Sequence, residues 1–341
     1  MLRVENLTVG YRSRRTLKPV AENINLSLGA GEFVCLLGPN GAGKSTLMRT
    51  IAGMQPPLAG RVLLDGTDVQ TLTANQRAAR LSVVLTERVT AGLLTVYSMV
   101  GLGRYPHTGW FGKLTAEDHE AVGRAIRLAG VEAFSHRLVN QLSDGERQRV
   151  MMARALAQEP RLMILDEITA FLDLPRRVEI MKLLGGLAGD AGRSILISTH
   201  DLDLALRTAD RIWLLRADGT LCTGAPEDLV LDGSFADAFA AEGIEFDPMR
   251  GAFNVRKDIG ARIKVVGGDA IQRKWTLLAL ERCGFQAMDQ DKDVPAPSPC
   301  PSIEPLGPEG WRLRHGSVTN TFDKLYDLVR ELKEISLPKQ Q

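Results

Sequence analysis

A glycine-rich segment at residues 38–45 has the composition of a phosphate-binding loop. Its sequence, Gly-Pro-Asn-Gly-Ala-Gly-Lys-Ser, fits the pattern G-x-x-x-x-G-K-[ST] between a predicted buried strand and a predicted helix. Glycines let successive backbone N–H groups converge on an anion, and the helix N-terminus adds a favourable dipole. In such a loop the Lys44 ammonium bridges the β- and γ-phosphates, and the Ser45 hydroxyl is a ligand for Mg²⁺. The residues expected to bind the phosphates of a nucleoside triphosphate are Gly38, Pro39, Asn40, Gly41, Ala42, Gly43, Lys44, Ser45 and Thr46.

Two carboxylates follow a short apolar strand predicted at residues 162–165. Asp166 would lie at the carboxyl edge of a parallel sheet, beside the phosphate loop, and hold Mg²⁺ through water. Glu167 would then polarise the hydrolytic water. His200 follows another buried strand, at residues 194–198, and is a candidate for contact with the γ-phosphate. Taken alone, Asp166 and Glu167 could be solvated acids at a strand end, and His200 could be an ordinary loop histidine. The neighbouring phosphate loop favours a catalytic site instead.

A third motif, Leu-Ser-Asp-Gly-Glu, precedes a helix predicted over residues 147–158. Ser143 and Glu146 have the S-x-x-E spacing of a capping box at a helix start. The same helix terminus is also a second anion site, where Ser143 and Gly145 present a hydroxyl and an N–H to a phosphate. The two interpretations are compatible, so capping does not argue against function.

The elements around these motifs predict an α/β core followed by a second unit. Strand-like alternation in the first 70 residues is followed by a mainly helical stretch, and then by alternating strands and helices over residues 162–215. From about residue 243 the pattern predicts β-α-β-β-α, with a last helix over residues 321–332. Six of the 16 prolines lie in residues 295–308, which we predict to be a loop that cannot join a central strand.

Composition narrows the class of protein. The 341 residues carry 42 Lys+Arg and 41 Asp+Glu, a net charge of +1, which argues against a dedicated nucleic-acid-binding protein. The four cysteines (Cys35, Cys222, Cys283 and Cys300) form no CxxC pair, which predicts reduced thiols in a cytosolic protein. Apolar stretches fall short of the roughly 20 residues that cross a bilayer, and no secretory signal is recognisable. We expect a soluble protein that works at a membrane only through a partner.

The motifs, in this order, resemble those of the ATP-binding subunits of ABC transporters. The resemblance covers residues 1–240 and implies an α/β P-loop NTPase (ABC ATPase) fold, with an antiparallel β subdomain and a helical subdomain at about residues 90–158. Residues 243–341 would be a small C-terminal α+β extension of unknown role. The implied activity is ATP hydrolysis, with ATP and Mg²⁺ as cofactors.

The resemblance also implies roles for single residues. In that family two subunits form a head-to-tail homodimer, and each ATP lies between one phosphate loop and the partner's signature motif. Glu167 matches the catalytic base, His200 the switch histidine and Tyr11 the aromatic residue that stacks on adenine. Asp173 matches the loop that crosses the dimer interface. The signature residues that would act in trans are Ser143, Asp144, Gly145 and Glu146.

Three positions depart from the family pattern. Asp144 stands where glycine is usual, and Ile168 replaces the proline after the two acids. Thr86 occupies the position of a glutamine that contacts Mg²⁺ and relays the nucleotide state to the membrane subunits. Because adjacent side chains of an extended segment point to opposite sides, we expect Thr86 to face the nucleotide through water and Glu87 to face the helical subdomain or the permease. Which of the two replaces the glutamine is left open.

Residues 94–110 resemble the segment that, in importers of iron–siderophores, haem and cobalamin, receives a coupling helix from the permease. Tyr105, His107 and Trp110 are then interface candidates. The alternative is an amphipathic helix and an aromatic loop that cover the domain's own core.

The resemblance therefore implies the energy-coupling ATPase of a bacterial ABC importer. Its partners would be transmembrane permease subunits and, indirectly, a substrate-binding protein, but no nucleic acid. It would lie at the cytoplasmic side of the inner membrane as a peripheral subunit. The alternatives are a soluble ABC ATPase that acts on nucleic acid or the ribosome, and an exporter ATPase. The transported ligand cannot be inferred from these residues, because the binding protein and the permease select it.

Overall fold

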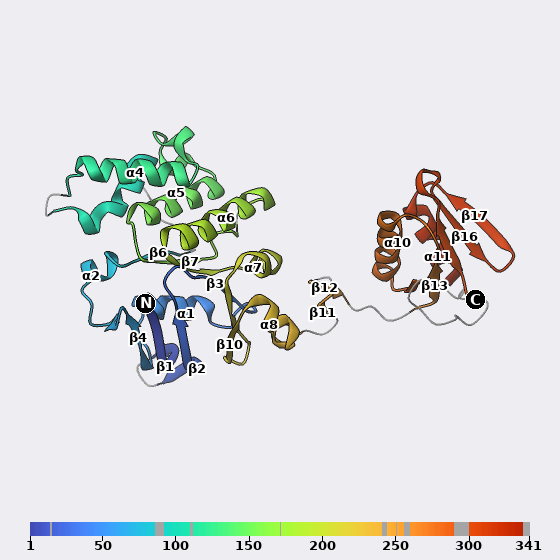
Figure 1. Ribbon diagram of the computed structural model, residues 1–341, viewed down its shortest axis with the longest axis horizontal. Coiled ribbons are helices and arrows are strands. Elements are labelled where there is room, and N and C mark those ends of the chain that lie inside the picture. Colours follow the sequence, from blue (N-terminus) through green and yellow to red (C-terminus); the bar gives the residue numbers. More distant parts are fainter. Residues whose placement is uncertain are drawn as a thin grey trace. The chain divides into compact units, whose positions relative to one another are not determined.

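The computed structural model describes residues 1–13, 16–85, 92–109, 112–170, 172–240, 244–249, 251–255, 260–289 and 300–336. The chain divides into two compact units (Figure 1). The first comprises Met1–Ala240 and Pro248–Ala252, and the second comprises Ala241–Asp247 and Phe253–Gln341. Among the described helices, none has the length and apolarity that spanning a membrane requires.

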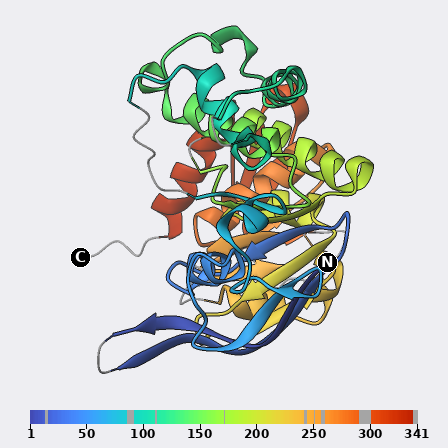
Figure 2. The same cartoon turned by 90° about the vertical axis from the view of Figure 1, so that its left-hand side faces the viewer.

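An antiparallel sheet with the order β2-β1-β4-β5 forms one layer of the first unit. Its strands are β1 (Leu2–Arg12), β2 (Leu17–Leu28), β4 (Ala59–Leu64) and β5 (Thr67–Asp68). Leu2 and Val4 of β1 are buried alternately, as expected of a sheet with one face on the core, and the burial resumes at Leu7 and Val9 after a register shift between Val4 and Leu7. Figure 2 shows the blue β1–β2 pair at one end of this unit and the green helical part at the other.

The second layer is a six-stranded sheet with the order β10-β9-β3-β8-β7-β6. The strands are β3 (Phe33–Leu37), β6 (Leu81–Val84), β7 (Leu162–Asp166), β8 (Ser194–Ser198), β9 (Arg211–Leu215) and β10 (Leu221–Gly224). All neighbours are parallel except β9 and β10. Every residue of β3, β7 and β8 is buried, as expected of central strands covered on both faces.

The register of this sheet brings the predicted site residues to one edge. Leu36 of β3 and Asp166 of β7 both pair with Ser198 of β8. The loops that follow these three strands therefore leave the same edge of the sheet. The helices that accompany the sheet are α1 (Lys44–Ile51), α2 (Ala74–Ala78), α6 (Leu174–Ala191), α7 (Leu202–Thr208), α8 (Pro226–Leu231) and α9 (Ser234–Ala238).

A helical part lies between β6 and β7, where the sequence predicts it. It comprises α3 (Val96–Gly101), the 3₁₀ turns η1 (Leu102–His107), η2 (Glu132–Phe134) and η3 (Val139–Gln141), and the longer helices α4 (Ala116–Leu128) and α5 (Asp144–Ala157). Thr115 caps α4 and Ser143 caps α5, each through a complete capping box. Helix α3 ends at Gly101, and the chain then tightens directly into η1.

The second unit is a five-stranded sheet with two helices and a separate hairpin. The sheet order is β14-β13-β15-β16-β17. Its elements are β13 (Arg262–Val265), α10 (Ala270–Arg282), β14 (Gln286–Asp289), β15 (Ser302–Pro305), the turn η4 (Gly307–Glu309), β16 (Trp311–His315), β17 (Val318–Phe322) and α11 (Leu325–Ser336). Leu280 of α10 and Leu328 of α11 share one core with Ile263, Ile303 and Leu313 of the sheet. The hairpin joins β11 (Ile244–Asp247) to β12 (Ala252–Val255).

Two sequence predictions for this unit are wrong. The proline-rich stretch contains β15, the middle strand of the sheet. The strand can form because Pro301 precedes it and Pro305 ends it. The backbone N–H groups between these two prolines can therefore still donate hydrogen bonds to the neighbouring strands. The helix predicted over residues 321–332 begins only at Leu325, because Val318–Phe322 pairs with β16 as a strand.

Candidate functional site

The phosphate loop follows β3 and opens α1, as its motif predicts. Gly41 and Gly43 have φ of 80° and 105°, and Gly43 is the N-cap of α1. A Cβ at Gly43 would lie 2.2 Å from Val20 Cγ1, and one at Gly38 would lie 2.1 Å from the Leu215 carbonyl oxygen. The loop therefore has its shape only with glycine at these positions.

Lys44 lies inside this loop. Its ammonium donates hydrogen bonds to the carbonyl oxygens of Gly38, at 2.8 Å, and Pro39, at 3.1 Å, and the residue is 6% exposed. Burial lowers the pKa of Lys44, whereas the negative charges of Glu167 and Asp166 raise it. A buried cation held by neutral carbonyls of its own loop fits the binding of an anion such as a polyphosphate.

The acidic residues form a connected network at the ends of β7 and β8. The Ser198 hydroxyl donates to Asp166 Oδ1 at 2.5 Å, and the Glu167 N–H donates to Ser198 Oγ at 3.0 Å. Asp166 is 2% exposed, while Glu167 and His200 reach the surface. The His200 Nε2 lies 2.8 Å from Glu167 Oε1. The structure thus brings together Asp166, Glu167 and His200, which the sequence connects only by their strand-end positions.

Two contacts at this edge were not predicted from the sequence. The Gln148 amide donates to the Glu167 carbonyl oxygen at 3.1 Å, which ties α5 to the end of β7. The Tyr11 hydroxyl lies 2.9 Å from Thr46 Oγ1, so Tyr11 stands at the start of α1 with its ring half exposed. A glutamine two residues after a capping box is the only sequence signal for the first contact. The position of Tyr11 beside α1 is compatible with stacking on a nucleotide base.

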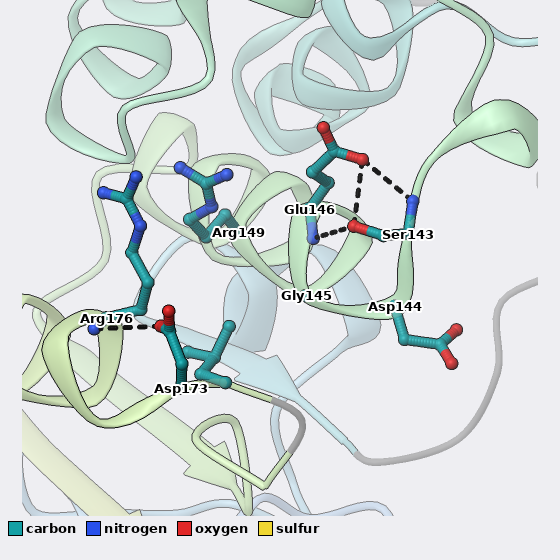
Figure 3. Close-up of a pocket in the computed structure, with 8 residues that line it drawn as sticks. Ser143, Asp144, Gly145, Glu146, Arg149, Asp173 and Arg176 are labelled. Carbon is teal, nitrogen blue, oxygen red and sulfur yellow. Dashed lines mark hydrogen bonds between the residues drawn. The ribbon is translucent and has the colours of Figure 1, made fainter.

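The signature motif forms a separate site (Figure 3). Ser143 donates to Glu146 through both its N–H and its hydroxyl, at 2.9 Å each, which lowers the pKa of Glu146. A cavity of about 410 Å³ adjoins the motif. It is lined by Ser143, Asp144, Gly145, Glu146, Arg149, Leu172, Asp173 and Arg176. No phosphate-loop residue lines it, so the structure keeps the two predicted phosphate sites apart within one chain.

The two aspartates that line this cavity have different partners. Asp173 is the N-cap of α6 and accepts from the Arg176 N–H at 3.3 Å. Asp144 points away from Arg149 and Arg176 (Figure 3) and accepts from Arg147 Nη1 at 2.9 Å. The acid that replaces the usual glycine is therefore paired by a neighbouring cation on the same helix.

The remaining predictions fall partly outside the described residues. Thr86, Glu87 and Trp110 are not among them, so their predicted roles remain predictions. Tyr105 is 73% exposed on η1, and its interface role remains a prediction. His107 also reaches the surface, and its Nε2 lies 2.9 Å from the Gln158 carbonyl oxygen.

Fold and site together define a P-loop nucleoside triphosphatase: a buried strand, a glycine loop with a buried lysine, and two acids at the end of β7, a parallel strand of the same sheet. Comparison with known proteins gives the family. The "ABC transporter" family matches residues 21–170, and the "Iron ABC transporter C-terminal domain" matches residues 260–333.

Relatives and solved structures agree with this match. An uncharacterized ABC transporter ATP-binding protein, MJ0873 of Methanocaldococcus jannaschii, is 39% identical over 76% of this chain and 88% of its own length. The ferric enterobactin transport ATP-binding protein FepC of Escherichia coli is 38% identical over 67% and 83%. The dimeric bacterial ABC transporter cassette MJ0796 superposes with a TM-score of 0.59 at 30% identity, covering 66% of this chain and 99% of the cassette.

The chain therefore belongs to the ABC transporter family and is one of its ATP-binding subunits, an ATPase. Other relatives are named as siderophore transport and cobalamin import ATP-binding proteins. The resemblance to the iron–siderophore and cobalamin subgroup and the P-loop fold class are thus confirmed.

Proposed function

We propose that this chain is the energy-coupling ATPase of an importer for an iron chelate, or for a related haem- or cobalamin-like ligand. One observation carries the ATPase part: the phosphate loop, Asp166, Glu167 and His200 converge at one sheet edge, with His200 hydrogen-bonded to Glu167. The names of the relatives and the iron-transporter match of the C-terminal residues support the ligand class.

In the proposed mechanism, Lys44 and the N–H groups of the loop and α1 hold the phosphates of ATP. Ser45 and Asp166 would hold Mg²⁺, which would neutralise negative charge on the phosphates. Glu167 accepts a proton from the attacking water, and His200 keeps the Glu167 carboxylate oriented through their 2.8 Å contact. Tyr11 provides the face on which the adenine stacks.

The separation of the two phosphate sites supports action in trans. A head-to-tail dimer would place the cavity beside Ser143 and Gly145 against the nucleotide of the partner subunit, with Asp173 at the dimer interface. Closure of this dimer would drive conformational changes in separate permease subunits. The permease subunits would in turn receive the ligand from a substrate-binding protein. The proposed location is the cytoplasmic face of a bacterial inner membrane, without a nucleic-acid partner.

We also propose that the chain consists of two domains with different roles. Residues 1–240 form the ATP-binding domain, with the helical subdomain at about residues 90–158, and residues 243–341 form an extension that does not contribute to catalysis. The presence of every site residue before residue 201 supports this division.

The test is co-purification combined with an ATPase assay. The tagged full-length chain is expressed in its natural host and purified from solubilised membranes. Co-purification of a polytopic permease, together with Mg²⁺-dependent ATP hydrolysis, is the expected result. Recovery with ribosomes or nucleic acid, and no membrane protein, would favour a soluble ABC ATPase and contradict the proposal.

A further inference from the structure

Arg104 is a buried cation in the helical part, outside the nucleotide site. It lies in η1, is 4% exposed, and has three partners. Its Nε donates to Asp118 of α4 at 2.8 Å. Its Nη1 donates at 2.8 Å to the Ala157 carbonyl oxygen and at 2.8 Å to Glu159, both at the C-terminal end of α5. One planar guanidinium thus joins η1, α4 and the end of α5.

The neighbours of Arg104 hold η1 on the same end of α5. A Cβ at Gly103 would lie 2.2 Å from the Arg154 carbonyl oxygen, so the two backbones are in close contact. His107 reaches the Gln158 carbonyl oxygen, and the Gln158 amide donates to the Leu81 carbonyl oxygen of β6 at 2.6 Å. The end of α5 is therefore a junction where η1, α4 and β6 meet.

The other end of α5 carries the signature motif. The helix has 14 residues, which spans about 20 Å at 1.5 Å per residue. Its middle is packed into the core through Val150, Met152 and Ala153. Near its start, Gln148 also holds the carbonyl of Glu167. Helix α5 therefore connects the η1 end directly to the signature motif and, through Gln148, to the turn that holds Glu167.

An ion pair as buried as Arg104–Asp118, with side chains 5% exposed each, is weak evidence of a contribution to stability. Desolvation of both charges offsets much of their attraction, whereas the geometry of the guanidinium fixes how three elements are joined. Leu102 and Tyr105, on either side of Gly103 and Arg104, are 51% and 73% exposed. A partner pressing on η1 there acts on a segment that Arg104 anchors to α5.

We propose that Arg104 is a positioning residue that couples η1 to α5, so that force applied by the permease at Leu102 and Tyr105 moves the signature motif. The inference rests on the proposed function, because it requires a permease partner. Arg104 touches neither nucleotide nor reacting atoms; it acts through the rigid junction at the end of α5.

The test compares ATPase rates of the isolated chain with those of the same chain in proteoliposomes with its co-purified permease. In Arg104→Lys the charge is kept, but an ammonium cannot make the three in-plane contacts of the guanidinium. We expect the isolated rate to stay within about twofold of wild type and the stimulation by the permease to fall by about fivefold or more. Unchanged stimulation would overturn the proposal.

Two variants separate coupling from mere folding. Arg124→Ala removes the exposed second partner of Glu159 and leaves Arg104 in place, so wild-type stimulation is expected. Glu159→Gln loosens the hold of Arg104 on α5 and should reduce stimulation partially, so this variant decides the question if Arg104→Lys does not fold. A variant could also lose both ATPase rate as an isolated chain and Tm while the ratio of its rates with and without permease stays unchanged. That result would show that Arg104 has a purely structural role and would contradict the proposal. A wild-type chain without ATPase activity or permease refutes the proposed function itself, before any variant is compared.

Discussion

Glu167 has a left-handed backbone, with a φ of 51°, although it is not glycine. Such a conformation costs on the order of 1 kcal/mol and persists only where the surroundings hold it. Here the N–H is bound by Ser198, the carbonyl by Gln148 and the carboxylate by His200. The first two contacts hold the backbone of Glu167, and the third fixes the direction of its carboxylate. The strain is therefore located at the residue to which we assign the proton transfer.

The first prediction concerns this carboxylate. Glu167→Gln keeps the shape of the side chain but removes the base, so ATP hydrolysis should fall by about 10²–10⁴-fold while ATP still binds. Gel filtration with ATP should then show an accumulated dimer. A variant with near-wild-type turnover would rule out Glu167 as the base, and a persistent monomer would contradict the in-trans arrangement.

The second prediction concerns Asp144, the acid in the signature motif. In the proposed dimer it adds a negative charge near the partner's triphosphate, offset by Arg147 at 2.9 Å. In a Glu167→Gln background, Asp144→Gly should lower the ATP concentration needed for dimer formation by about fivefold, as removal of a ~1 kcal/mol repulsion in water implies. The effect should shrink at high salt. Arg147→Ala is the matched control and should act in the opposite direction; shifts of the same sign in both variants would contradict the charge argument.

At the scale of helices and strands, the sequence predicted features that depend on neighbouring residues better than features that depend on contacts between distant segments. The capping box of Ser143 and Glu146 was recognised from the sequence because its residues lie three positions apart, although α5 begins at Asp144 and not at the predicted residue 147. The central position of β15 does not follow from its sequence, because it depends on pairing with β13 and β16, which are distant along the chain. The junction around Arg104 was missed for the same reason, since its partners Asp118 and Glu159 are brought together only by packing.

The third prediction tests this junction by its pH dependence. Hydrogen bonds from Thr115 and from the Arg104 guanidinium lower the pKa of Asp118 from 3.8 to about 2. A carboxyl with a lowered pKa in the folded state stabilises the fold above the unfolded pKa and ceases to do so as the pH falls through the folded pKa. The difference in Tm between wild type and Asp118→Asn should therefore be constant above about pH 4 and shrink as the pH falls toward about 2.

A difference in Tm that is independent of pH over this range would show that the Asp118 charge does not contribute to stability. Asp203→Asn, which removes an exposed ion pair on α7, is the control and should show little difference at any pH.

At the scale of the whole molecule, the two units have separate hydrophobic cores. That of the second unit is built from its own strands and helices, including Leu280, Leu313 and Leu328. The first unit contains the phosphate loop, both acids, His200 and the signature motif. From the sequence, the family resemblance over residues 1–240 and the β-α-β-β-α pattern from about residue 243 led us to expect a C-terminal extension, and no site motif occurs in it.

The last prediction follows from this separation. A chain truncated after Glu242 should fold and bind ATP with an affinity within about threefold of the full-length chain, since all the proposed contacts lie in the first unit and distant sites contribute independently. Binding is measured by fluorescence of a labelled ATP analogue, with circular dichroism to establish folding. Lys44→Ala in the truncated chain is the control and should abolish binding, because it removes the side-chain cation placed among the phosphate-loop residues. If a folded truncation loses binding while the full-length chain retains it, the second unit completes the nucleotide site, and the proposed division of the chain is wrong.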